Sequence, residues 1–162
     1  SREPATATGG VRDGATTTPT ATKTRTKMAL FEWRDEYSVK IASIDTQHQK
    51  LVVILNQLHE GMVSGHGTEH LSSVLASLVE YTAKHFAFEE QLFAEHQYPQ
   101  TKEHIEEHQR LVTQVLDFQK KYATGQASIN MQLMKFLKDW LIKHILGSDK
   151  LYVAHLVERG VK

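Results

Sequence analysis

Three pairs of metal-binding side chains interrupt helical stripes of apolar residues, and a further histidine lies upstream of them. The pairs are His85 with Glu89, His104 with His108, and His144 with Asp149, and the upstream residue is His48. On an α-helix, a four-residue step returns to within about 40° of the same direction. Leucines continue the stripes on both sides, so these polar groups face an interior, where burial without partners costs on the order of several kcal/mol each. The spacing therefore predicts four helices that converge on one polar site.

Apolar residues at three- and four-residue steps mark the four helices. They are Leu51, Leu55, Leu58 and Met62 in the first, Leu71, Leu75, Leu78 and Leu92 in the second, Leu111, Val115, Phe118 and Tyr122 in the third, and Leu133, Leu137, Trp140 and Leu141 in the fourth. Breaks fall at residues 64–67, 98–99 and 124–125, and we expect Ser128 to be the N-cap of the fourth helix. Short connections between amphipathic helices favour an all-α, up-down-up-down antiparallel four-helix bundle.

The first 27 residues differ from the rest of the chain, with nine threonines and no aromatic residue. Such a segment buries too little apolar surface to offset its ordering entropy, so residues 1–27 are predicted to be a disordered tail or linker. Met28 resembles a natural start, which leaves an added sequence, an interdomain linker or a native extension as origins of the tail. The folded domain is expected to span residues 28–162 and to begin with an apolar arm over residues 31–41.

The pair in the fourth helix has a five-residue step instead of four. Five residues turn an ideal helix by about 500°, which leaves Asp149 roughly 140° away from His144. Both side chains can reach one centre only if the helix is underwound between them, as in a π-helix, and Gly147 makes that deformation easier. In the alternative interpretation, Asp149 faces solvent and pairs with a neighbour such as Lys150.

The chemistry of the predicted site follows from its donor atoms. The chain has no cysteine, which excludes disulfides, thiolate zinc sites and iron–sulfur clusters. Imidazole binds iron, zinc, copper or nickel, and carboxylates can bridge two cations, so the residues indicate a buried two-metal centre. The other histidines are expected to have ordinary structural roles; they are His59, His66, His70, His96 and His155.

Composition limits the partners of the chain. The formal net charge is zero, so no broad basic face is available for nucleic acid. No apolar run approaches the roughly 20 residues of a membrane span, and no signal-peptide core is present. We expect a cytoplasmic protein without a nucleic-acid or membrane partner, as a monomer with an oligomer left open.

The ordered set of motifs resembles the bacterial hemerythrin domain over the segment from Phe31 to Lys162. The matching motifs are Asp45-x-Gln47-His48, His85-Phe86-x-x-Glu89-Glu90, Tyr98-Pro99 with His104-x-x-x-His108, and Trp140-Leu141-x-x-His144-x-x-x-x-Asp149. A single HxxxH pair is a weak signal, whereas the whole set in this order is specific.

The resemblance implies reversible O2 binding, without enzymatic turnover, at a non-haem di-iron centre. His104, His108 and His144 would bind one iron, and His48 and His85 the other. Glu89 and Asp149 would bridge both irons, together with an oxo or hydroxo group, which leaves an open position for O2 on the second iron. Trp140 and Leu141 would wall the O2 pocket, a role that is compatible with plain core packing.

Three alternatives stay open at this point. One is a di-iron oxidase or peroxidase, although the chain has no inward Glu-x-x-His pair of the kind found in ferritin-like di-iron proteins. Another is an O2-sensing module of a larger signalling protein, with the tail as its linker. The third is occupancy by zinc or manganese, because a sequence specifies ligands better than it specifies the metal.

Overall fold

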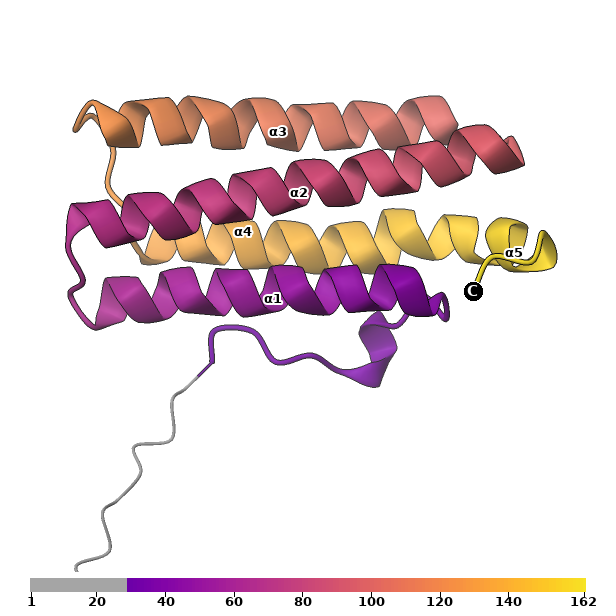
Figure 1. The fold of residues 1–162 in the computed structure, drawn as a ribbon, viewed down its shortest axis with the longest axis horizontal. Helices are drawn as coiled ribbons and strands as arrows, with labels where there is room; N and C mark the ends of the chain where they lie inside the picture. The colour runs from indigo at the N-terminus through magenta and orange to yellow at the C-terminus, as the bar shows by residue number, and fades with distance from the viewer. Residues whose placement is uncertain (1–28) are drawn as a thin grey trace, which may run out of the picture.

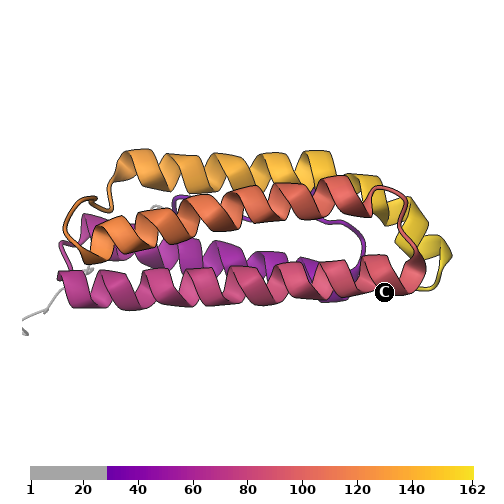
Figure 2. The same cartoon turned by 90° about the horizontal axis from the view of Figure 1, so that it is seen from above.

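The computed structural model describes residues 29–162. Its main helices are α1 (Ala42–Val63), α2 (Thr68–His96), α3 (Thr101–Ala123), α4 (Met131–Lys143), the π-helix η2 (His144–Asp149) and α5 (Lys150–Glu158). Figures 1 and 2 show α1, α2 and α3 side by side with a fourth, continuous helix formed by α4, η2 and α5. Successive helices run in opposite directions and are joined by short loops, which confirms the predicted all-α antiparallel four-helix bundle.

The predicted N-terminal arm precedes α1 and contains a short 3₁₀ turn, η1 (Asp35–Tyr37). It runs back along α1 (Figure 1) and is held at both ends by side chains of that helix. The backbone N–H of Phe31 donates to Asn56 Oδ1 at 3.0 Å, and Asn56 Nδ2 donates to the Phe31 carbonyl at 2.8 Å. Near the start of α1, Asp45 Oδ1 accepts from the backbone N–H of Val39 at 2.8 Å. The arm thereby closes one side of the bundle with buried apolar residues.

The fourth helix begins two residues later than predicted, so the assignment of Ser128 as its N-cap is wrong. Asn130 is the N-cap, and its Oδ1 accepts from the backbone N–H of Leu133 at 3.0 Å. Both residue types cap helices well, so tertiary packing decides between them. Ile129 and Met134 are both buried, and they occupy the positions of a hydrophobic staple on either side of this cap.

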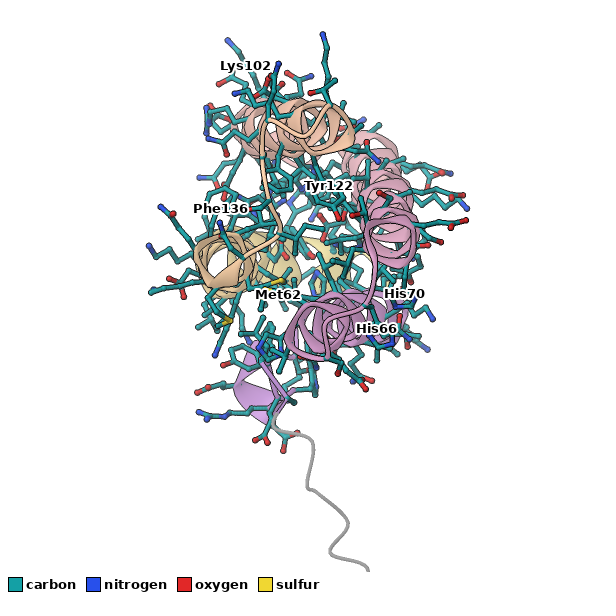
Figure 3. The ribbon with its side chains drawn as sticks, turned by 90° about the vertical axis from the view of Figure 1, so that its left-hand side faces the viewer. Met62, His66, His70, Lys102, Tyr122 and Phe136 are labelled. Atoms are coloured by element: carbon teal, nitrogen blue, oxygen red, sulfur yellow. The ribbon has the colours of Figure 1, made fainter. Side chains whose placement is uncertain are left out.

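The core is continuous between the arm and all four helices. Figure 3 views the bundle from one end and shows side chains from four helices filling the space between them. Residues 1–28 lie outside the described part of the chain, so the expected disorder of residues 1–27 stays a prediction. Within the part that the structure describes, no helix is both long and apolar enough to cross a membrane.

Candidate metal centre

The structure brings all seven side chains expected from the sequence into one buried cluster inside the bundle. Each of them is at most 4% exposed, and Glu89 and Asp149 are fully buried. Each of the four helices contributes: His48 comes from α1, His85 and Glu89 from α2, His104 and His108 from α3, and His144 and Asp149 from η2. The polar residues that interrupt the apolar stripes therefore meet at one point in the interior of the bundle.

Glu89 lies between histidines of different helices and directs one oxygen to each side. Its Oε1 lies 3.4 Å from His85 Nε2 and 3.7 Å from His48 Nε2. Its Oε2 lies 3.2 Å from His108 Nε2 and 3.5 Å from His104 Nε2. The two oxygens of one carboxylate therefore serve two separate sets of nitrogens.

Asp149 has the same two-sided arrangement. Its Oδ1 lies 3.0 Å from His144 Nε2 and 3.2 Å from His104 Nε2, while its Oδ2 lies 3.1 Å from His48 Nε2. Two groups of potential ligands result, each with donor atoms within 4.8 Å of one another. We call Glu89, His104, His108 and His144 the three-histidine half, and His48, His85, Glu89 and Asp149 the two-histidine half.

Several buried atoms of the cluster have no hydrogen-bond partner. These atoms are both ring nitrogens of His48, Glu89 Oε2, His104 Nε2 and both carboxylate oxygens of Asp149. Unpartnered polar atoms in a protein interior are costly, and cations would satisfy most of them at once. A donor set of imidazole nitrogens and carboxylate oxygens fits iron, which the hemerythrin-like motifs imply.

The fourth helix is underwound where the five-residue step required it. The π-helix η2 runs from His144 to Asp149, and both of these side chains are buried. The alternative in which Asp149 faces solvent is therefore wrong. Gly147 is exposed, a Cβ added there would meet no atom within 4 Å, and its φ is not positive. The underwound turn thus does not depend on a glycine at this position.

Three of the histidines are oriented by a second hydrogen bond at the ring nitrogen that faces away from the centre. The Nδ1 atoms of His85, His108 and His144 lie 2.8, 2.9 and 2.8 Å from Gln47 Oε1, Glu90 Oε1 and Glu107 Oε1. We call Gln47, Glu90 and Glu107 the outer partners. An acceptor at Nδ1 fixes a proton there and directs Nε2 to the centre, where this nitrogen can bind a metal once it carries no proton.

The outer partners follow a regular pattern that the sequence interpretation missed. Each is the immediate neighbour of a candidate ligand on one helix and bonds a histidine of the next helix along the chain. Adjacent residues on a helix point about 100° apart, so a residue beside an inward ligand faces the neighbouring helix. Two signals in the sequence could have found them. One is the adjacency of Gln47 to His48, of Glu90 to Glu89 and of Glu107 to His108, and the other is the place of Gln47 and Glu90 in the hemerythrin-like motifs. The pattern ends at His48, whose Nδ1 is buried without a partner.

Two further residues near the site were also missed. The hydroxyl of Tyr152 in α5 donates to Glu89 Oε1 at 2.6 Å, and the Ser148 hydroxyl donates to Glu107 Oε2. Burial, together with the nearby carboxylates of Asp149 and Glu89, raises the pKa of Tyr152 well above its usual value, so it stays a donor.

The charges of the cluster shift the titration of its members. Burial disfavours the charged form of His48 and His144, but the carboxylates of Asp149 and other partners outweigh it and raise their pKa values to about 9 and about 10. For His85 burial dominates and lowers the pKa to about 4. Burial also opposes ionisation of Glu89 and Asp149, yet the surrounding histidines hold both pKa values low. In the metal-free cluster, ionised Glu89 and Asp149 therefore face protonated His48 and His144, while His85 stays neutral.

Aromatic and apolar side chains cover one side of the cluster. The Phe86 ring stacks on His108 at a centroid distance of 3.7 Å, and the Trp140 ring stacks on His144 at 4.5 Å. Phe86, Trp140 and Leu141 also line an apolar cavity of ≈ 40 Å³. Trp140 and Leu141, the two residues expected at the O2 pocket, therefore both line this apolar space, and Trp140 also stacks on a histidine of the cluster.

The other five histidines lie outside both groups of potential ligands in the described part of the chain. His66 and His70 face each other at the outer surface, at the end of the bundle where α1 joins α2 (Figure 3). His155 Nε2 bonds the backbone carbonyl of His96 at 2.7 Å, which joins the ends of α2 and α5.

Comparison with known proteins gives one consistent result. The model of the hemerythrin HHE cation binding domain matches residues 39–156. A bacteriohemerythrin of Stenotrophomonas maltophilia is 35% identical over 133 residues, which are 80% of this chain and 86% of that protein. A bacteriohemerythrin of Methylococcus capsulatus is 34% identical over 77% of this chain and 95% of its own length. The crystal structure of a wild-type hemerythrin matches with a TM-score of 0.76 and 32% identity, over 79% of this chain and 98% of that one. The chain belongs to the hemerythrin family.

Proposed function

We propose that the chain binds O2 reversibly at a di-iron centre and that the seven clustered residues are its ligands. His104, His108 and His144 would hold one iron and His48 and His85 the other, and Glu89 and Asp149 would each contribute to both. The observation that carries this assignment is the two-sided geometry of both carboxylates, each of which has one oxygen near the nitrogens of either half. Iron held by these residues would supply the reversible redox chemistry of O2 binding.

The surrounding side chains limit access of water to the site. The cavity beside the site is lined almost entirely by apolar groups from all four helices. Its single polar lining residue, Thr82, already donates its hydroxyl to the Leu78 carbonyl at 2.7 Å. A space of this kind favours a small neutral molecule such as O2 over water, which needs several polar partners. We infer that Trp140 and Leu141 form part of the O2 pocket.

The direct test is an anaerobic O2 titration of the iron(II)-loaded protein followed by visible absorption. We expect two irons per chain and a coloured form that bleaches when O2 is removed with argon. Irreversible oxidation in the first cycle would contradict reversible binding, and one metal per chain would contradict the di-iron assignment.

Substitution of a bridging carboxylate tests the ligand assignment. Glu89→Ala removes a ligand from both irons, so elemental analysis should find both metals lost or strongly reduced. His70→Ala is the matched control, because His70 is exposed and distant from the cluster, and it should retain two irons. Retention of both irons and of reversible O2 binding in Glu89→Ala would refute the bridge.

The absence of enzymatic turnover is part of the same proposal. The seven candidate ligands include one glutamate, and it has a histidine four residues before it instead of the Glu-x-x-His pairs of ferritin-like di-iron proteins. A reductant-driven turnover assay that yields product would favour the oxidase or peroxidase alternative. We also propose a cytoplasmic monomer, which cell fractionation and sedimentation analysis of the full chain would test.

A further inference from the structure

The two halves of the site differ in the chemical type of the side chains that hydrogen-bond the outer Nδ1 atoms of their histidines. In the three-histidine half, the outer partners of His108 and His144 are the carboxylates of Glu90 and Glu107. In the two-histidine half, the outer partner of His85 is the amide of Gln47. The side chains of Glu90 and Glu107 are 33% and 30% exposed, so both carboxylates lie at the edge of the site, within reach of water. The outer acceptors are therefore two carboxylates in one half and a neutral amide in the other.

The bridging carboxylates do not offset this difference. Glu89 directs Oε1 to one half and Oε2 to the other, and Asp149 does the same with Oδ2 and Oδ1. Both halves therefore share the carboxylates of Glu89 and Asp149. The difference in charge between the halves comes from the outer partners.

The two halves also differ in how firmly their histidines are held. Glu107 accepts hydrogen bonds from both His144 Nδ1 and the Ser148 hydroxyl, which fixes its position. In the other half, His48 Nδ1 is buried with no acceptor, so His48 lacks the outer hydrogen bond that His108 and His144 have. Only one histidine of the two-histidine half has an outer hydrogen bond, whereas two histidines of the three-histidine half have one.

We propose that the site loads in order, with the first metal ion entering the three-histidine half, and that Glu90 and Glu107 act as the positioning residues that set this order. The inference rests on the proposed function, because it needs two metal positions. An anionic acceptor strengthens electron donation by the imidazole and attracts the cation through the ring, and loss of such a partner typically costs about 10- to 100-fold in metal affinity. Gln47 supplies the hydrogen bond alone.

Anaerobic titration of the metal-free full chain with Co²⁺, followed by visible absorption, tests the order. We expect two binding steps. Glu107→Gln keeps an oxygen acceptor for His144 but removes the charge, so it should weaken the first step by about 10- to 100-fold and leave the second nearly unchanged. Gln47→Glu adds a charge behind His85, so it should strengthen the second step and bring the two steps closer together.

Three further variants complete the experiment. Glu106→Gln is the matched control, because Glu106 precedes Glu107 on α3 but faces solvent, 4.0 Å from Lys102, and it should leave both steps unchanged. His85→Ala should keep the first step and lose the second, whereas His108→Ala should lose the first. Circular dichroism of each metal-free variant verifies that the bundle is folded.

The outcomes separate the two proposals. Fewer than two Co²⁺ ions per wild-type chain would overturn the two-metal function itself. Two ions with unchanged step constants in both Glu107→Gln and Gln47→Glu would leave the function intact and overturn the ordering by outer charge. Loss of the first step in His85→Ala would overturn the assignment of that step to the three-histidine half.

Discussion

The hydroxyl of Tyr152 donates a 2.6 Å hydrogen bond to Oε1 of Glu89, so the last helix holds a carboxylate that the second helix supplies. Both residues are fully buried, and the bonded oxygen is the one that faces the nitrogens of His48 and His85. The bond therefore connects the packing of α5 directly to the two-histidine half.

Tyr152→Phe should lower the free energy of unfolding of the metal-free protein by about 1.5–3 kcal/mol, because a hydrogen bond to a buried charged group is lost. Chemical denaturation measures this change. Tyr122→Phe is the control, since Tyr122 is only partly buried and its hydroxyl makes no hydrogen bond in the described structure. Equal losses in the two variants would contradict a specific role for the Tyr152 hydroxyl.

The stability of the metal-free protein should be greatest near pH 6.5, the ordinary pKa of histidine. The pKa values of His48 and His144 are raised to about 9 and about 10, so their contribution is complete below pH 6.5 and is lost as the pH rises through those values. The pKa of His85 is lowered to about 4, so stability falls as the pH drops from 6.5 toward 4. Thermal melts of the metal-free chain between pH 5 and pH 9 measure the profile.

The stability that metal binding adds should increase with pH, whereas the stability of the metal-free protein should fall above pH 6.5. His48 and His144 must each release a proton before they can bind a cation, so metal affinity should increase as the pH rises from 6.5 toward 9. Melts of Co²⁺-loaded protein should therefore separate progressively from the metal-free melts as the pH increases. A constant separation over this range would show that neither histidine is protonated in the metal-free site.

Deletion of Gly147 should be tolerated. Without this residue, His144 and Asp149 would be separated by an ordinary four-residue step, which an α-helix can place on one face. Such a chain should straighten η2 and keep two metals. Deletion of Lys143, the last residue of α4, should instead turn His144 about 100° out of its buried position and lose metal. Elemental analysis of both deletions distinguishes them, and equal metal loss would mean that the π-helix itself is required.

Asn130→Ala should destabilise the protein by about 1 kcal/mol, whereas Ser128→Ala should have almost no effect. The first change removes the side-chain acceptor for the Leu133 N–H, and the second affects an exposed residue outside the helix. Denaturant midpoints of the two variants provide the comparison. A larger loss in Ser128→Ala would mean that the helix begins earlier in solution.

Sequence alone predicted the parts of the site that depend on one helix at a time. Polar interruptions of an apolar stripe identify inward ligands such as His85 and Glu89, because the stripe itself defines the buried face. The five-residue step from His144 to Asp149 predicted underwinding in the same way, since the geometry concerns only the fourth helix.

The features that were missed depend on the neighbouring helix. Whether Glu107 reaches His144 depends on which helices are adjacent and on their axial offset, neither of which appears in the periodicity of α3. The start of the fourth helix is a similar case, since Ser128 and Asn130 are both good caps and the burial of Ile129 decides between them. Contacts of this kind are set by the packing between helices, so the residue pattern of a single helix does not predict them.

The positions of the two tryptophans give the protein its own optical reporters. Trp140 stacks on His144 of the three-histidine half, and the Trp33 ring lies 6.4 Å from the His48 ring of the two-histidine half. Since these are the only indoles in the chain, Trp33→Phe and Trp140→Phe each leave a single emitter beside one half. Fluorescence quenching in the two variants would then record the arrival of a metal ion at each half separately, in real time and without an added label.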